Sequence, residues 1–129
     1  MDTSLEVATR VLGASHPNTL TALGNLGELL ALEGRPAEAL PLLTTSLEGT
    51  RQALAPTHVN VGIALRKYGA CLTALRPHAE AEAALLQAYE IIRSAVGAEH
   101  HRTRAVVHDL IALYRTWGKP DQVSRWQRS

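Results

Sequence analysis

The chain has 129 residues, 46% of them hydrophobic and 19% charged, which is enough apolar material for one folded domain and unlike the composition of a disordered chain. Thirteen Lys and Arg residues against twelve Asp and Glu residues give a net charge of +1, far from the basic excess that nucleic-acid binding requires. The single cysteine cannot form an intramolecular disulfide, and no apolar run approaches the roughly 20 residues that cross a membrane. We therefore expect a cytoplasmic globular domain with no nucleic-acid or membrane partner.

The sequence repeats with a period of 42 residues, because the segment at 12–16 returns in related form at 54–58 and 96–100 with the apolar positions downstream in register. Within each unit, apolar residues recur three and four positions apart, which is typical of amphipathic helices with one buried face. Each unit contains two such stretches, so the sequence predicts an all-α fold of antiparallel helix pairs. We expect a single domain over 1–129, made of the end of a preceding repeat (1–11), two repeats (12–53 and 54–95) and a divergent terminal repeat (96–129).

In chain order, the pattern predicts about seven helices: a partial one near 3–12, then helices near 17–33, 36–53, 58–75, 78–95, 101–117 and 120–128. Ser15 or His16 is expected to cap the first complete helix. Gly34 suits a left-handed helix end, and Pro36 suits the first position of the next helix. The third unit repeats this turn, whereas the middle unit has Arg76 before a proline, which disfavours a helical conformation at Arg76. Pro41 lies inside a predicted helix and should bend it locally.

Small residues recur where the two helices of a pair should approach most closely. They are Gly27 and Ala39 in the first unit and Gly69 and Ala81 in the second, where larger side chains would overpack the contact. The third unit has an isoleucine and a valine at the aligned positions 111 and 123. Its two helices are therefore expected to pack less closely.

The spacing Leu23-x-x-Leu26-Gly27-x-x-Leu30, followed by Ala39, Leu43 and Ser46, resembles the tetratricopeptide repeat, and the second unit fits the same pattern. The 42-residue period, longer than the usual repeat, resembles the kinesin-light-chain type. The resemblance implies a right-handed α-solenoid superhelix, and a non-enzymatic module without a cofactor that binds a protein or peptide on its concave face. The segment 113–120 also resembles the last repeat of bacterial signalling proteins, some of which carry a kinase domain upstream.

In this family the first helix of each repeat lines the groove, which implies ligand contacts for Asn25, Glu28, Arg66, Lys67, His108, Asp109 and Arg115. The family commonly uses an asparagine at the position of Asn25 to bind the main chain of a peptide, since an amide offers a donor and an acceptor. Arg66 and Lys67 add positive charge that suits a carboxylate, so we hypothesise an acidic peptide ligand. The alternative is that both are merely the solvated face of a helix. Glu28 and Asp109 on the same face allow a ligand of mixed charge.

Six histidines raise the alternative of a metal site, above all His100, His101 and His108. Structural zinc normally uses four convergent ligands, and the chain has one cysteine and no metal-binding motif, so we expect no metal. His16, His58 and His100 recur at the loop that enters each first helix, where an imidazole can cap the helix or pack at the turn.

Catalysis and self-association are the other two alternatives. Cys71 aligns with Leu29 and Leu113 on the buried face of a helix, where a thiol behaves as a small hydrophobe, and the sequence has no nucleophile elbow or phosphate loop. We therefore expect no enzyme. Each repeat of a solenoid contacts only its neighbours, so an array that begins within a repeat leaves an apolar helix face that a homodimer could cover.

Overall fold

The computed structural model describes residues 17–128, where six helices are joined by short turns. They are α2 (Pro17–Leu32), α3 (Pro36–Ala53), α4 (Val59–Leu75), α5 (His78–Val96), α6 (His101–Trp117) and α7 (Pro120–Gln127). The described residues contain no strand, which confirms the all-α prediction, and every helix in this range begins and ends within one residue of its predicted position. The partial helix near 3–12 and the cap at Ser15 or His16 lie outside the described residues.

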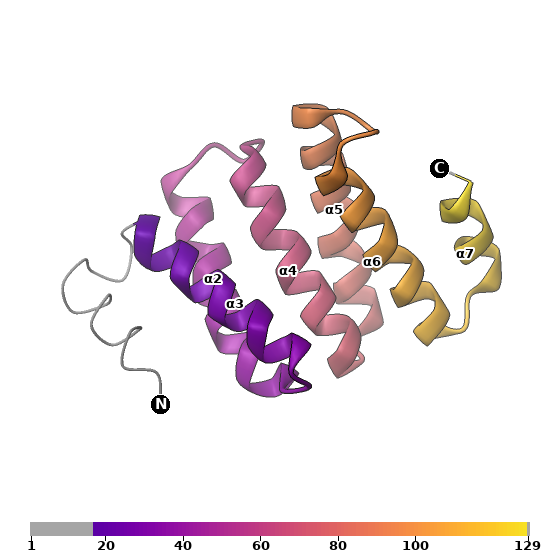
Figure 1. Ribbon diagram of the computed structural model, residues 1–129, viewed down its shortest axis with the longest axis horizontal. Coiled ribbons are helices and arrows are strands. Elements are labelled where there is room, and N and C mark those ends of the chain that lie inside the picture. Colours follow the sequence, from indigo (N-terminus) through magenta and orange to yellow (C-terminus); the bar gives the residue numbers. More distant parts are fainter. Residues whose placement is uncertain (1–16, 129) are drawn as a thin grey trace.

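The helices form three antiparallel hairpins, α2 with α3, α4 with α5 and α6 with α7, which follow one another along the long axis of the molecule (Figure 1). Successive hairpins are joined by contacts of α3 with α4 and of α5 with α6. The first helices α2, α4 and α6 also touch their neighbours directly, whereas the backbones of the second helices α3 and α5 do not approach each other. The array therefore curves toward the first helices, as in an α-solenoid of tetratricopeptide type.

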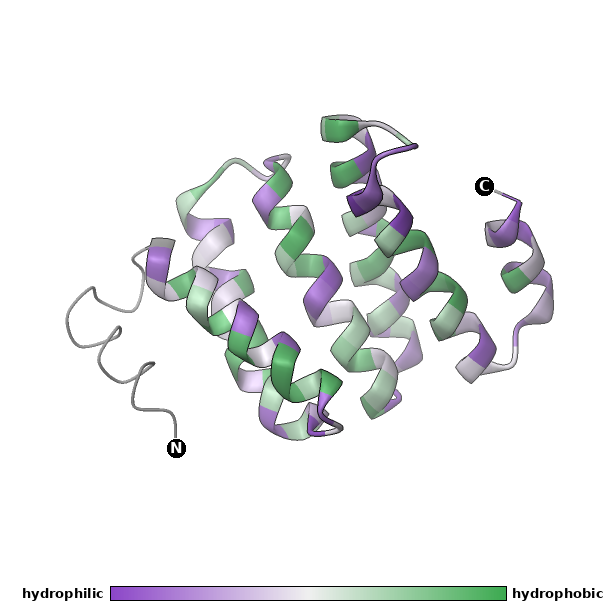
Figure 2. Ribbon diagram, viewed as in Figure 1, coloured by the Kyte–Doolittle hydropathy of each residue, from purple (hydrophilic) through white to green (hydrophobic). Residues whose placement is uncertain are grey.

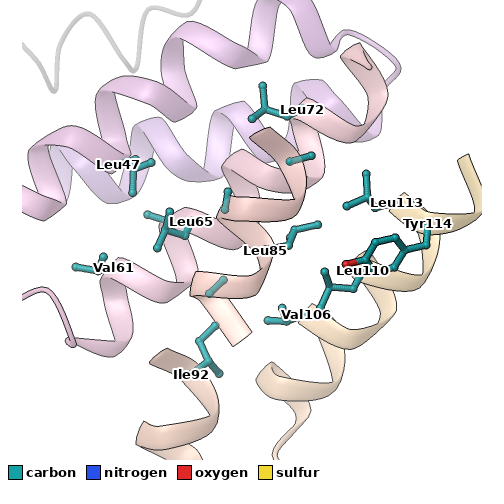
Figure 3. Close-up of a cluster of buried hydrophobic side chains, with 14 residues drawn as sticks. Leu47, Val61, Leu65, Leu72, Leu85, Ile92, Val106, Leu110, Leu113 and Tyr114 are labelled. Carbon is teal, nitrogen blue, oxygen red and sulfur yellow. The ribbon is translucent and has the colours of Figure 1, made fainter. Parts of the chain in front are cut away.

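The main core lies between α3, α4, α5 and α6. Leu47, Leu65, Leu85 and Leu110, one from each of these helices, belong to one cluster of buried side chains (Figure 3). Hydrophobic residues gather between the helices, while α7 is mostly hydrophilic (Figure 2). The core is thus aliphatic, and its largest fully buried side chain is Tyr114.

The close contacts within the first two hairpins depend on glycine. A Cβ atom at Gly27 would lie 2.7 Å from Leu43 Cγ, and one at Gly69 would lie 2.8 Å from Leu85 Cγ. Both distances are shorter than real Cβ contacts, so the glycines let the paired helices approach each other. The alanines that face them, Ala39 and Ala81, are fully buried, which confirms the role predicted for the small residues.

The third hairpin packs less closely, as expected. Among the described residues, α7 contains no buried residue, whereas α3 and α5 contain five each. Val123 and Trp126 of α7 are only partly buried against the core. In the first hairpin, Pro41 lies inside α3, where a local bend was expected. The helix continues through Pro41 as one element.

The hairpin turns share a left-handed residue at the end of the first helix. Gly34 has a φ of +83°, and the following N–H of Arg35 donates to the carbonyl of Leu30 over 2.9 Å. The middle turn places Arg76 at a φ of 80°, a conformation that costs a residue with a side chain roughly 1–2 kcal/mol. Pro77 follows Arg76 and has no N–H to donate. The middle turn therefore lacks the backbone hydrogen bond that Arg35 and Lys119 make in the other two turns.

Histidine caps the first helix of the second and third hairpins. His58 Nδ1 accepts the N–H of Asn60 at 3.0 Å, and His100 Nδ1 accepts the N–H of Arg102 at 3.1 Å. Each bond satisfies a backbone donor that the first turn of a helix leaves free. The capping role predicted for these histidines is confirmed, while His16 lies outside the described residues.

Candidate functional site

Five of the seven predicted ligand-contact residues lie together on the face formed by the first helices. This face carries Asn25 and Glu28 from α2, Arg66 and Lys67 from α4, and Asp109 from α6. Asn25, Lys67 and Asp109 are 42 residues apart in sequence, so the repeat places them at one register position on three successive helices. The prediction that these side chains share a surface is thus consistent with the fold.

One guanidinium joins all three repeats. Arg66 Nη2 donates to Glu28 Oε2 at 2.9 Å, and its Nη1 donates to Asp109 Oδ2 at 2.8 Å. All three side chains are partly buried, which strengthens charge-assisted hydrogen bonds relative to pairs in bulk water. Burial raises the pKa of Asp109 above its ordinary value, and the nearby charge of Arg66 opposes this effect only in part. We call the row Glu28–Arg66–Asp109 the ion-pair bridge.

Lys67 lies next to the ion-pair bridge and is more deeply placed. Its Nζ donates to Asn25 Oδ1 at 3.0 Å and is 3.8 Å from Glu28 Oε1. Burial is the main cause that lowers the pKa of Lys67; the charge of Glu28 opposes it, and the charges of Arg66 and Arg102 add to it. Its strongest contact is therefore with a neutral amide.

The ion-pair bridge changes what Arg66 can offer to a ligand. Its positive charge is shared between two carboxylates of the protein itself, and the same bonds occupy Glu28 and Asp109. The adjacent Arg66 and Lys67 were expected to form a cationic patch. The charge of Arg66 is instead balanced by carboxylates of the protein. Sequence reasoning placed these residues on one face, but it did not predict that they bind one another.

A cavity of 380 Å³ opens beside Lys67, between α2, α3 and α4 and the start of α6. Its polar lining comes from Thr21, Asn25, Ser46, Thr50, Asn60, Lys67 and Arg102, and its apolar lining includes Leu20, Ile63 and Ala64. No carboxylate from residues 17–128 lines it. We call it the groove cavity.

Asn60 and Arg102 are functional candidates that sequence reasoning missed. They are 42 residues apart and lie in the first turns of α4 and α6. Each lies seven residues before a predicted contact residue, Lys67 and Asp109, and thus on the same helix face. Extending the predicted face two turns toward the start of each helix would have found both.

His108 and Arg115 remain separate from the other predicted contacts. Both are exposed on α6, and within residues 17–128 neither forms an ion pair with the five residues described above. They lie on the helix that supplies Asp109 and extend the candidate surface along it.

The described residues provide little for catalysis or metal binding. Cys71 is buried, its Sγ donates to the carbonyl of Pro36 at 3.3 Å, and burial raises the pKa of its thiol. A raised pKa disfavours the thiolate that a nucleophile needs. His100 and His101 stack with ring centroids 4.3 Å apart, but no group of three potential metal ligands occurs in this part of the chain. None of the helices from α2 to α7 is long and apolar enough to span a membrane.

Comparison with known proteins agrees with the repeat structure. A family model described as tetratricopeptide repeat matches residues 1–52, a range that includes α2 and most of α3. A search of curated protein sequences gave no significant match. The α4–α5 hairpin repeats the close-contact residues of the matched region 42 residues later, a period consistent with the kinesin-light-chain type. Residues 1–52 therefore match the tetratricopeptide-repeat family, and the hairpins that follow repeat the same architecture.

Proposed function

We propose that the chain is a non-enzymatic interaction module that binds a segment of another protein along the face of α2, α4 and α6. The observation that supports this most is the groove cavity, because three successive hairpins line it with polar and apolar side chains. Its 380 Å³ falls within the roughly 300–1,000 Å³ typical of ligand sites. Tetratricopeptide repeats suggest protein partners, and no set of catalytic groups competes with that function among the described residues.

The ligand we propose is an extended segment with at least one acidic residue. Glu28, Arg66 and Asp109 already satisfy one another, so they offer a ligand a polar but balanced surface. Lys67 donates its hydrogen bond to a neutral amide, and its ion pair with Glu28 is long, at 3.8 Å, so its charge is balanced less closely than that of Arg66. The acidic-peptide hypothesis therefore depends on Lys67 more than on Arg66.

The resemblance of residues 113–120 to bacterial signalling proteins suggests the setting. We propose that the module acts as a scaffold within such a protein in the cytoplasm. The groove is short, so other repeats or several simultaneous contacts would raise a modest affinity.

A photo-crosslinking amino acid tests the proposed face directly. Thr21 is exposed and lines the groove cavity, whereas Gln87 is exposed beside the outer groove between α3 and α5. With p-benzoylphenylalanine at Thr21, we expect adducts with a partner protein in the source cell, because the probe lies in the binding face. The matched probe at Gln87 should give none of these adducts. Equal adduct formation at both positions, measured by mass spectrometry, would contradict binding along the first helices.

Self-association is a second candidate function, favoured by the exposed face of α2. Leu29 is 52% exposed, whereas the aligned Cys71 and Leu113 are 1% and 0% exposed. Cys71 is covered by Ala39 and Leu43 of α3, the second helix of the preceding hairpin. The face around Leu29 thus has the shape and chemistry that receive a second helix elsewhere in the array. We propose that a second copy of the chain can cover it.

Light scattering across a concentration series tests this candidate. If a second copy covers the α2 face, the mass should rise toward that of a dimer with concentration, and Leu29→Gln with Leu32→Gln should keep the chain monomeric. Leu32 is 80% exposed, so the double change should leave folding intact. Leu86→Gln, an exposed leucine on α5, is the control and should not change the mass. A wild-type mass that stays monomeric throughout would eliminate self-association.

A further inference from the structure

Among the residues that the structure describes, two cations and no carboxylate line the groove cavity, and Glu28 lies outside the lining with its Oε1 3.8 Å from Lys67 Nζ. We infer that the cavity binds an acidic side chain of the ligand between Lys67 and Arg102, with a neighbouring aliphatic side chain against Leu20, Ile63 and Ala64. This inference rests on the proposed function, because it assigns a ligand class to part of the same face. It also moves the anion site away from Arg66.

The charges around the cavity support an anionic ligand. Lys67 and Arg102 both line it, and none of the other described lining residues is charged. Within residues 17–128, the guanidinium of Arg102 forms no ion pair, whereas Lys67 donates to the neutral amide of Asn25 and has Glu28 as a distant ion-pair partner at 3.8 Å. A cavity lined by charge of one sign concentrates the field inside it, and a carboxylate placed there would relieve the repulsion between the two cations.

Arg66 shows the contrast on the same helix. Its guanidinium already has two carboxylate partners at 2.8 and 2.9 Å, so an incoming anion would have to displace Glu28 or Asp109. Arg102 requires no such displacement, and Lys67 has its carboxylate neighbour only at 3.8 Å. The anion site therefore lies between Lys67 and Arg102, toward the start of α6, rather than at the Arg66–Lys67 pair.

The walls of the cavity favour a side chain carried by a continuous segment. Asn25 and Asn60 present amides, which can pair with the N–H and C=O groups of a passing main chain. Beyond Asn25, the same face continues to the polar ion-pair bridge, so a bound chain can extend past the cavity. The buried Leu20 and the partly buried Ile63 add an apolar wall. An Asp or Glu beside a Leu, Ile or Val matches this combination.

Selection from a random peptide library tests the inference. The library displays dodecapeptides within a loop of a carrier protein, so both peptide ends are joined and no free carboxylate terminus exists. The bait is the full 129-residue chain. We expect enriched peptides with an acidic residue next to an aliphatic one. A labelled synthetic peptide of the enriched sequence then gives affinities by fluorescence anisotropy.

Two matched changes examine the charge contact from both sides. Arg102→Gln should weaken binding of the acidic peptide about tenfold or more, because it removes a charge-assisted hydrogen bond to the carboxylate. Replacing the acid of the peptide by its amide should weaken binding to the wild type by a similar factor, without any change to the protein. Arg104→Gln is the control, since Arg104 is exposed two residues later and pairs with Glu99 at 2.9 Å. It should leave the affinity unchanged.

The outcomes separate this inference from the proposed function. Suppose that the enriched peptides carry no acidic residue but still block photo-crosslinking from the probe at Thr21. This result would overturn the anion site and leave the groove function standing. Equal losses with Arg102→Gln and Arg104→Gln would do the same. A second library displays the same dodecapeptides with a free carboxylate terminus. Enrichment from this library alone would show that the cavity binds a chain end rather than an acidic side chain, and would overturn the assignment. No enrichment from either library would overturn the anion site and count against the groove function as well.

Discussion

Replacing Gly69 with leucine is expected to destabilise the fold by about 3 kcal/mol, because the new side chain overpacks the contact between α4 and α5. Even a Cβ atom at this position would lie 2.8 Å from Leu85 Cγ and 3.3 Å from the backbone oxygen of Ala81. Leu85 and Ala81 are fully buried, so neither can move aside without disturbing the main core. The loss should appear as a lower midpoint of urea denaturation followed by circular dichroism.

Two variants separate overpacking from other effects of the change. Ala83→Leu adds a leucine to the exposed side of α5 and should leave the midpoint nearly unchanged. Gly69→Ala should fall between the wild type and Gly69→Leu, because alanine gains about 1 kcal/mol in helix propensity but still meets Leu85. If Gly69→Leu and Ala83→Leu unfold at the same urea concentration, close helix contact at Gly69 is not what stabilises this hairpin.

Replacing Arg66 with methionine is expected to cost about 2 kcal/mol at pH 7, since it leaves Glu28 and Asp109 without their shared cation. This figure is below that of a fully buried pair because all three side chains are partly exposed. Thermal unfolding by circular dichroism measures the loss. Arg115→Met is the control, because Arg115 is exposed on α6, and it should unfold close to the wild-type temperature.

The Arg66→Met variant should also respond to pH in a defined direction. Burial raises the pKa of Asp109, so its contribution to stability is fully present below the ordinary aspartate pKa of about 4 and is lost as pH rises through the higher folded pKa. Removing Arg66 raises that folded pKa further, because the attraction that opposed burial is gone. The deficit relative to wild type should therefore shrink as pH falls from 7 toward 4. A deficit that stays constant over this range would show that packing rather than charge explains the loss, and Asp109→Asn in the variant should abolish the pH response.

The fold was predictable because its signals are local and repeated. A glycine in the place of Gly34, after an amphipathic stretch and before a proline, indicates a helix end. Small residues at Gly69 and Ala81 indicate that the two helices of a hairpin approach closely, whichever hairpin follows. The helix ends followed from these signals to within one residue. Arg76 was harder, because a left-handed arginine is set by the spacing of the hairpin rather than by its own preference.

The candidate site was predictable only in part. The register of the repeat placed Asn25, Lys67 and Asp109 on one face, but their partners depend on distances between helices of different repeats. Arg66 has two carboxylates within reach across those distances, and nothing in its own sequence neighbourhood indicates which it binds. Arg102 was missed for a similar reason, since the cavity that it lines exists only once α6 packs beside α4.

The two helix layers of the array are unequally spaced. The inner helices α2, α4 and α6 touch their neighbours in the row. On the outer side, where α3 and α5 stay apart, an open groove of 630 Å³ lies over Val61, Leu65 and Ile91. The inner face is therefore continuous across the three hairpins, whereas the outer face is interrupted between α3 and α5. A segment bound on the inner side can pass from one repeat to the next without crossing a gap between helices.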